Sequence, residues 1–153
     1  MNRRLLLLTF LGLLVPPALA HDAKVGAITI QHPYAPAMPG AAKTGIVYAT
    51  IVNRGDADRI VGATTTAAER VELHTTVRDG TAMRMRAVEA IPLPMGGTLA
   101  LQPGQRFHLM LINLAKPLRE GDSFPMRLTF EKAGAVDLTI QVERLKSGGN
   151  HHH

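Results

Sequence analysis

An antiparallel β-sandwich or β-barrel is the fold class that the sequence predicts, on three observations. Short runs of β-branched, aromatic and other apolar residues recur along the chain, separated by turn signals that contain Gly, Pro, Asn or Asp. No long segment shows the apolar period of an amphipathic helix. The chain has 153 residues, 46% of them hydrophobic, and no internal repeat, which predicts one globular domain with its own core.

The first strands are predicted from runs of apolar and β-branched residues. Val25–Ile30 is expected to be the first strand, and His32–Pro36, which holds two prolines, is expected to be an extended edge or a loop. The strands that follow in this half are predicted at Gly45–Asn53, Arg59–Thr65 and Arg70–Thr76.

A hairpin is predicted in the middle of the chain. Arg70–Thr76 is followed by the turn pair Asp79-Gly80 and by a returning strand, Thr81–Val88. Ile91–Pro94 again holds two prolines and is expected to be extended and unpaired on one side. The remaining strands are predicted at Thr98–Leu101, Phe107–Asn113, Ser123–Glu131 and Val136–Leu145.

The amino terminus has the order of a secretory signal peptide. Arg3 and Arg4 precede the apolar run Leu5–Val15, and Ala18-Leu19-Ala20 supplies a cleavage site. The run is too short to span a membrane comfortably, which argues against the alternative of an uncleaved membrane anchor; no stable membrane insertion is expected after cleavage. Residues 1–20 are therefore predicted to direct export to a bacterial periplasm. Residues 21–145 would form the folded domain and residues 146–153 a disordered tail.

Composition excludes several classes of function. The chain has no cysteine, which excludes disulfides, zinc–thiolate sites and cysteine nucleophiles, and argues against a blue-copper site. The formal net charge is +5, but the arginines alternate with acidic and apolar residues and form no basic run with aromatics. Nucleic-acid binding is therefore not expected, and the basic balance is interpreted as a solvated surface.

Soft metal-ligand residues are concentrated between His74 and Met110. Met83 and Met85 are two residues apart, as are His108 and Met110, and side chains two apart on a strand point to the same face. Imidazole and thioether without thiolate favour Cu(I) over zinc. Core packing or a surface histidine explains each residue taken alone. The combination predicts a copper site at a rim of the sandwich that a partner can reach.

Further motifs extend over most of the body, about Val25 to Val142, and with them the chain resembles the periplasmic copper chaperones of the PCuAC type. The motifs are His32-Pro33-Tyr34-Ala35, Tyr48 with Asn53-Arg54-Gly55, Asp58-Arg59-Ile60-Val61, Val71-Glu72-Leu73-His74, Met83-Arg84-Met85-Arg86, Leu101-Gln102-Pro103-Gly104, His108-Leu109-Met110-Leu111 and Leu128-Thr129-Phe130-Glu131.

The copper signature of that family is a His, ten residues, a Met, about twenty-one residues and His-x-Met. Here ten residues separate His74 from Met85 and twenty-two separate Met85 from His108, one more than the family pattern. The extra residue falls in Gln105-Arg106-Phe107, a turn where an insertion leaves the strand phase of His108 intact.

The resemblance implies a cupredoxin-like Greek-key β-sandwich that binds one Cu(I) through His74, Met85, His108 and Met110. Met83 shares a face with Met85 but does not fit the family spacing. The resemblance also implies a metallochaperone, not an enzyme, that delivers copper to the copper centre of a respiratory oxidase. The expected partner is then an oxidase subunit or an assembly factor.

A separate hypothesis concerns an auxiliary Cu(II) site. Cleavage after Ala20 would leave His21 as the first residue, whose α-amine and ring nitrogen can chelate Cu(II), although a chance polar residue explains it as well. The chain ends in His151, His152 and His153, as a native metal-binding tail or as the remnant of an affinity tag.

Two other classes of function stay open. One is a metal-free periplasmic interaction module, in which the histidines and methionines only pack or face solvent. The other is an enzyme, which is the weaker class because neither Ser123 nor Ser147 lies in a G-x-S-x-G elbow. A zinc hydrolase would want three His or carboxylate ligands. Glu72, a nearby acid, is expected to face solvent opposite or beside the His74 strand.

Overall fold

Eleven β-strands form the protein in a computed structural model that describes residues 22–38 and 40–144. This part of the chain contains no helix, so no helix in it is long and apolar enough to cross a bilayer. The strands are β1 (Ala23–Val25), β2 (Ile28–Pro36), β3 (Thr44–Asn53), β4 (Asp58–Thr65), β5 (Ala68–Asp79), β6 (Ala82–Ala87), β7 (Ile91–Leu93), β8 (Thr98–Leu101), β9 (Phe107–Leu114), β10 (Ser123–Phe130) and β11 (Gly134–Glu143).

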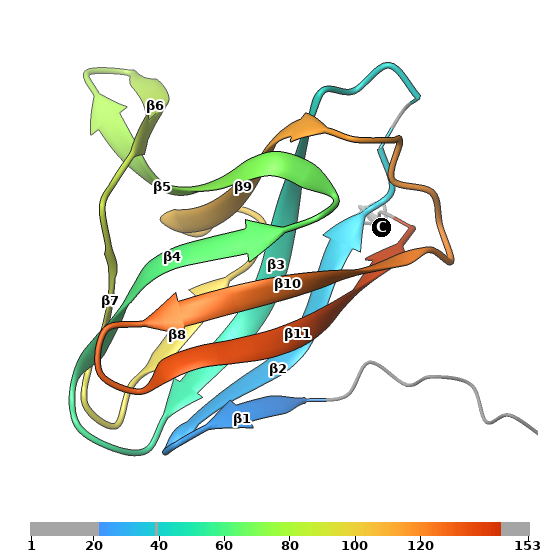
Figure 1. The fold of residues 1–153 in the computed structure, drawn as a ribbon. Helices are drawn as coiled ribbons and strands as arrows, with labels where there is room; N and C mark the ends of the chain where they lie inside the picture. The colour runs from blue at the N-terminus through green and yellow to red at the C-terminus, as the bar shows by residue number, and fades with distance from the viewer. Residues whose placement is uncertain (1–21, 39, 145–153) are drawn as a thin grey trace, which may run out of the picture.

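The strands follow one continuous path of pairing that curls into a sandwich. Its order is β6-β5-β9-β3-β2-β11-β10-β4-β7, with β1 added to β2 and β8 added to β3. The first half of β3 pairs with β9 and its second half with β8, both on the edge of β3 that does not pair with β2. Figure 1 shows β4, β10 and β11 in front of β3 and β8. The predicted all-β, cupredoxin-like sandwich is confirmed, with one parallel pair, β11 with β2, in an otherwise antiparallel arrangement.

The core lies between the layers and is built from alternate residues of the strands. On β9, Leu109 and Leu111 are fully buried, and they pack in one cluster with residues such as Ile30 and Phe130. Because side chains alternate along a strand, the residues between these leucines point away from the core. The same alternation that builds the core therefore assigns His108 and Met110 to the opposite face.

Two strand predictions near the amino terminus were wrong in detail. Val25–Ile30 is a hairpin of β1 and β2, with Gly26 at the turn in a left-handed conformation (φ 54°). The prolines of His32–Pro36 do not place this segment at an edge, because β2 continues through it between β3 and β11. Pro33 falls where the β2–β3 register shifts, and Pro36 ends the strand, so neither interrupts the ladder.

The other predicted strands are present. The pair β5 and β6 is the expected hairpin, with Gly80 in a left-handed conformation (φ 61°) at its turn. Within the described residues β7 pairs only with β4, as its prolines indicated. The predicted signal peptide, His21 and the terminal histidines lie outside the described residues.

Candidate metal site

Three neighbouring strands bring the predicted ligand residues onto one face. His74 on β5 lies directly opposite His108 on β9, and opposite residues of an antiparallel pair share a face, with Cβ atoms about 4.5–5.5 Å apart. Met110 follows two residues after His108, so it shares that face. Met85 on β6 is opposite Thr76, which lies two residues from His74, so Met85 shares the face too.

The register also separates Met85 from Met83. Met85 is opposite Thr76, whereas Met83 is opposite Arg78, one step further along the hairpin and away from His74. Both methionines are exposed, Met85 by 46% and Met83 by 60%. Position in the ladder therefore favours Met85 as the thioether nearer the histidines, although both side chains share the face.

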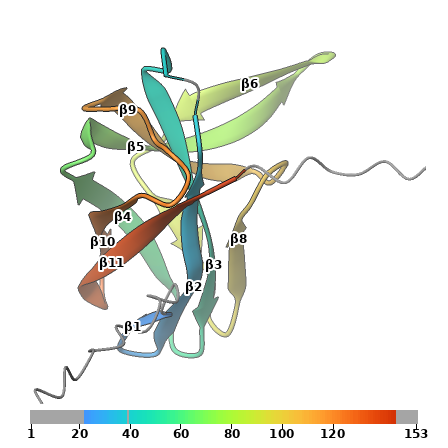
Figure 2. The ribbon, with the colours of Figure 1, turned by 90° about the vertical axis from the view of Figure 1, so that its right-hand side faces the viewer.

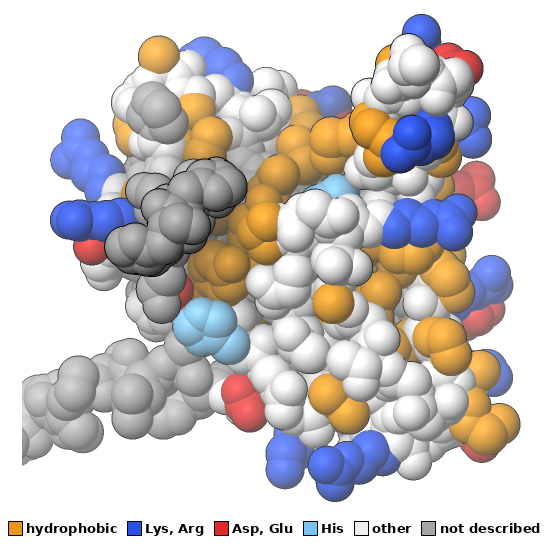
Figure 3. Space-filling view, turned by 180° about the vertical axis from the view of Figure 1, so that it is seen from behind, with side chains coloured by type: hydrophobic (Ala, Val, Ile, Leu, Met, Phe, Trp, Pro, Cys, Tyr) orange, Lys and Arg blue, Asp and Glu red, His pale blue; other side chains and the backbone are white. Residues whose placement is uncertain are grey.

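Burial increases from the hairpin toward β9. His108 is 7% exposed and the His74 side chain 16%, while Met110 is half-buried. In the space-filling view, a histidine lies sunken behind hydrophobic side chains, next to the lobe at the upper right that the β5–β6 hairpin forms (Figure 3). The candidate ligands thus form a site whose β9 side, with His108 and Met110, is the more buried and whose open side is Met85.

Both imidazoles present a nitrogen that has no hydrogen-bond partner. The Nδ1 atoms of His74 and His108 are buried and make no hydrogen bond within the described residues. A buried polar atom without a partner costs about 1–3 kcal/mol, so each such atom calls for an explanation, of which a bound metal ion is one. Two neutral imidazole lone pairs, with thioethers on the same face, are the donors that a soft metal ion needs.

Glu72 orients one of these rings, a role that was not predicted from the sequence. Its Oε2 lies 2.9 Å from Nε2 of His74, and Arg70 donates to its Oε1 at 2.8 Å. The contacts with His74 and Arg70 hold the pKa of the Glu72 carboxyl below its usual range. A carboxylate that accepts from Nε2 leaves Nδ1 as the free lone pair. Glu72 is partly exposed to solvent, as expected, but it also contacts His74, which was not predicted; the Glu-x-His spacing on a strand was the available signal.

The His108 ring is held in its neutral form. Burial, and secondarily the nearby His74, lower the pKa of His108 below its usual value. Desolvation penalises the charged imidazolium, so the neutral ring with a free lone pair is favoured. This is the protonation state in which imidazole binds a metal.

The lowered pKa of His108 predicts that acid lowers the free energy of unfolding of the copper-free protein. The unfolded chain takes up a proton near pH 6.5, whereas folded His108 does so only at lower pH. The free energy of unfolding should therefore be highest above about pH 6.5 and fall as the pH drops toward the folded pKa. Denaturant titrations across this range would measure the fall. The variant His108→Gln should show a smaller fall in the free energy of unfolding with acid, because the contribution of His108 is removed. The control His32→Gln should keep that contribution. A fall in His108→Gln as large as in the native protein would show that His108 does not cause it.

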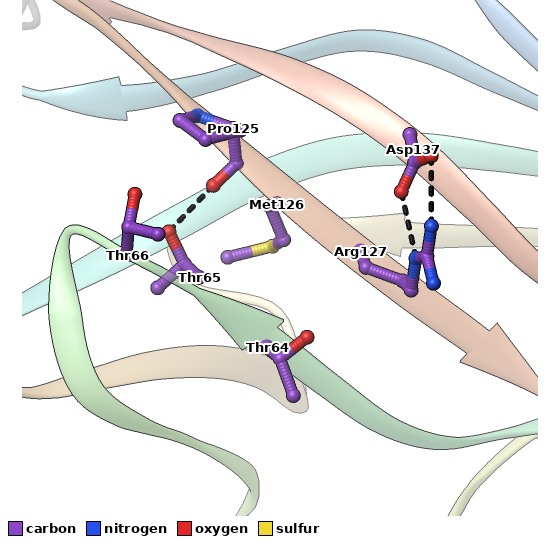
Figure 4. A pocket seen from close by; sticks show the side chains of 7 residues that line it. All are labelled: Thr64, Thr65, Thr66, Pro125, Met126, Arg127 and Asp137. Carbon is purple, nitrogen blue, oxygen red and sulfur yellow. Dashed lines mark hydrogen bonds and ion pairs between the residues drawn. The ribbon is translucent and has the colours of Figure 1, made fainter.

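The hollow between β4 and β10 in the described part of the chain offers no comparable donor set. A pocket of about 370 Å³ lies between β4 and β10, and its charged residues, Arg127 and Asp137, are bonded to each other at 2.8 Å (Figure 4). Thr65 donates to the Pro125 carbonyl at 2.6 Å. Among the described residues, no group of three or more His, Cys, Asp or Glu is placed to hold a metal ion. The candidate site on β5, β6 and β9 instead combines two histidines with methionine sulfur.

Comparison with solved structures places the fold among PCuAC domains. The "Copper-bound PCuAC domain from PmoF2" is 29% identical with a TM-score of 0.69, and the match covers 81% of this chain and 98% of that one. The solution structure of CuI-DR1885 from Deinococcus radiodurans is 26% identical with a TM-score of 0.64, covering 88% and 89% of the two chains. The resemblance to PCuAC domains is confirmed.

Comparison of sequences identifies the family. A curated relative, "Putative lipoprotein Lxx21020" of Leifsonia xyli subsp. xyli, is 35% identical over 92 residues, which are 60% of this chain; the match spans 54%, about half, of that relative's length. Residues 28–142 match the family described as "Putative lipoprotein LpqE-like". Since this match runs from the start of β2 nearly to the end of β11, the chain belongs to the LpqE-like family.

Proposed function

We propose that this protein is a periplasmic copper metallochaperone that carries Cu(I) on His74, Met85, His108 and Met110. The observation that carries the proposal is the shared face of these residues, on which both imidazole Nδ1 atoms are buried and unpartnered within the described residues. Neutral imidazole and thioether suit Cu(I), and the similarity to copper-bound PCuAC domains supports the same cargo.

The open side of the site suits transfer of the metal. All four ligands are neutral, so the bound ion keeps its positive charge and is not held by thiolate. Met85 is nearly half exposed, and it is the ligand that a partner can displace first. A partner that offers thiolates would then draw Cu(I) away by ligand exchange. We propose the copper centre of a respiratory oxidase, or its assembly factor, as the acceptor.

Metal analysis with X-ray absorption tests the ligand set. Protein reconstituted with Cu(I) under reducing conditions should bind one equivalent, with two sulfur and two nitrogen neighbours. A Cu(I) bound only by nitrogen and oxygen would refute the proposed ligands. Protein that takes up no stoichiometric copper would instead favour a metal-free interaction module.

Glu72 is expected to support copper binding through His74. Glu72→Ala should lower the Cu(I) affinity about 10–100-fold, because residues that orient a ligand typically contribute that much. Glu72→Gln should retain part of the affinity, since an amide oxygen can still accept from Nε2. Competition titrations with a Cu(I) chelator measure both. Glu69→Gln, which removes the same charge from the same strand, is the control. If Glu69→Gln lowered the Cu(I) affinity equally, Glu72 would act only through its charge and not by orienting His74.

Export and an auxiliary site complete the proposal. The lipoprotein descriptions of the family and its relative agree with an exported protein, and we assign export to the signal-like residues 1–20. His21 and the terminal His151, His152 and His153 would hold Cu(II) separately. Spectra of the oxidised copper form should change when the tail is removed, and identical spectra would refute the tail's part in this site.

A further inference from the structure

The β5–β6 hairpin is exposed along its outer strand. Every residue of β6 is exposed, and in the described chain β6 pairs only with β5, so its other edge is free. The hairpin extends beyond the rest of the sandwich, as Figure 2 shows. Met83 and Met85 are two of the most exposed large hydrophobic side chains in this part of the molecule. An exposed, unpaired strand with apolar side chains is the kind of surface that binds partners.

Positive charge is concentrated around these methionines. Within residues 76–87 and at residue 106, four arginines stand against one acid: Arg78, Arg84, Arg86 and Arg106 with Asp79. The other described residues carry ten Lys or Arg and eleven Asp or Glu, so the rest of the body is close to neutral. In Figure 3 the lobe formed by the hairpin bears several Lys or Arg side chains. The surplus of positive charge therefore belongs to the neighbourhood of the candidate metal site.

Most of these arginines are not neutralised by the protein itself. Arg84 pairs with Asp79 at 3.1 Å, whereas Arg78, Arg86 and Arg106 make no ion pair within the described residues. By contrast, arginines of other strands are paired with acids, as in Arg59–Glu131 and Arg127–Asp137.

The tertiary structure collects these charges from two distant segments. Thr76 donates its backbone N–H to the Arg106 carbonyl at 2.7 Å, which brings Arg106 against the hairpin. Arg78 is opposite Met83, and Arg86 follows Met85 on β6. We call Arg78, Met83, Arg84, Met85, Arg86 and Arg106 the hairpin surface. By strand alternation, Arg78 shares the face of Met83 and Met85, whereas Arg84 and Arg86 border the free edge of β6 from its other face.

We propose that the hairpin surface docks an acidic protein surface that borders the copper ligands of the acceptor. This inference rests on the proposed function. Carboxylates on the partner would pair with Arg78 and Arg86 and place the acceptor's ligands against Met85, where Cu(I) is most accessible. Such charge complementarity mainly raises the rate of association and fixes orientation, and it weakens with salt.

Two synthetic acceptor peptides test the surface. They share one pair of copper-binding cysteines and differ only in flanking runs of glutamate or of lysine. Transfer from the Cu(I)-loaded protein should be about tenfold or more faster to the glutamate peptide at low ionic strength, and the advantage should shrink with salt. The double variant Arg78→Gln/Arg86→Gln should lose the faster transfer to the glutamate peptide without a change in Cu(I) affinity. The control variant Arg54→Gln/Arg119→Gln changes the net charge equally, at exposed arginines outside the hairpin surface. It should keep the faster transfer to the glutamate peptide.

Three outcomes separate the alternatives. Equal rates for the two peptides, or equal losses in both double variants, would overturn the docking proposal while leaving copper binding intact. NMR titration of the copper-free protein with the glutamate peptide needs no metal: shifts at residues 77–87 in a protein that binds no Cu(I) would support the acidic partner and refute the proposed function. Binding to phosphatidylglycerol vesicles that depends on Arg78 and Arg86, with no glutamate preference, would overturn the proposal in favour of a membrane surface.

Discussion

Replacing Met85 and Met110 together by leucine is expected to lower the Cu(I) affinity at least about a hundredfold. Losing two ligands should cost more than the 10–100-fold effect of removing a residue that only supports a ligand. Leucine keeps the volume and apolar character of methionine, so the fold should lose less than about 1.5 kcal/mol. A competition titration with a Cu(I) chelator, alongside denaturant unfolding of the copper-free protein, separates the two effects.

Two methionines supply matched controls for this variant. Met83→Leu removes a thioether from the same face of the same strand, and Met95→Leu removes one that is 69% exposed and lies outside the three strands of the site. Both single variants should bind Cu(I) with nearly native affinity. If Met83→Leu lowered the Cu(I) affinity as much as Met85→Leu does, the preference for Met85 over Met83 as the thioether ligand of β6 would be refuted. An unchanged affinity in the Met85/Met110 variant would refute the thioether site altogether.

Replacing Leu109 by alanine is expected to destabilise the protein by about 2–5 kcal/mol. Leu109 is 1% exposed and lies between the two candidate ligands of β9, on the core face of the strand. Truncating a buried leucine removes transfer free energy and leaves a cavity, which together account for this range. Denaturant unfolding measures the loss.

The same variant tests whether core and site occupy opposite faces of β9. Well below its midpoint of unfolding, Leu109→Ala should lose far less Cu(I) affinity than the Met85/Met110 variant. Val61→Ala, at a residue 39% exposed on β4, should cost less than about 1 kcal/mol. A Leu109→Ala protein as stable as the native one would show that β9 does not present this face to the core.

Much of the site followed from local sequence because strand phase is a local property. The two-residue spacing of His108 and Met110 predicted, before any partner strand was known, that their side chains share one face. The Asp79-Gly80 turn likewise fixed the hairpin that carries Met85. The choice of Met85 over Met83 came from family spacing, and the ladder independently favours it.

Predictions failed where a proline or glycine had more than one structural meaning. The two prolines of His32–Pro36 indicated an edge, but one falls at a register shift and the other at a strand end, so the segment lies inside the sheet. Gly26 was included in a strand and forms a turn instead. In each case the pairing partners, which are distant in sequence, decided the outcome.

The sequence by itself determined the all-β class, the phase of each ligand pair and the soft, thiolate-free chemistry of the donors, because these depend on residue type and on separations of two residues. Only the tertiary structure decided that His74 stands opposite His108, that Glu72 holds one ring, and that Arg106 joins the arginines of the hairpin. These relations depend on the register between β5 and β9, strands about thirty residues apart in the chain. That register is set by burying one whole face of each strand in the core, and no local pattern encodes it.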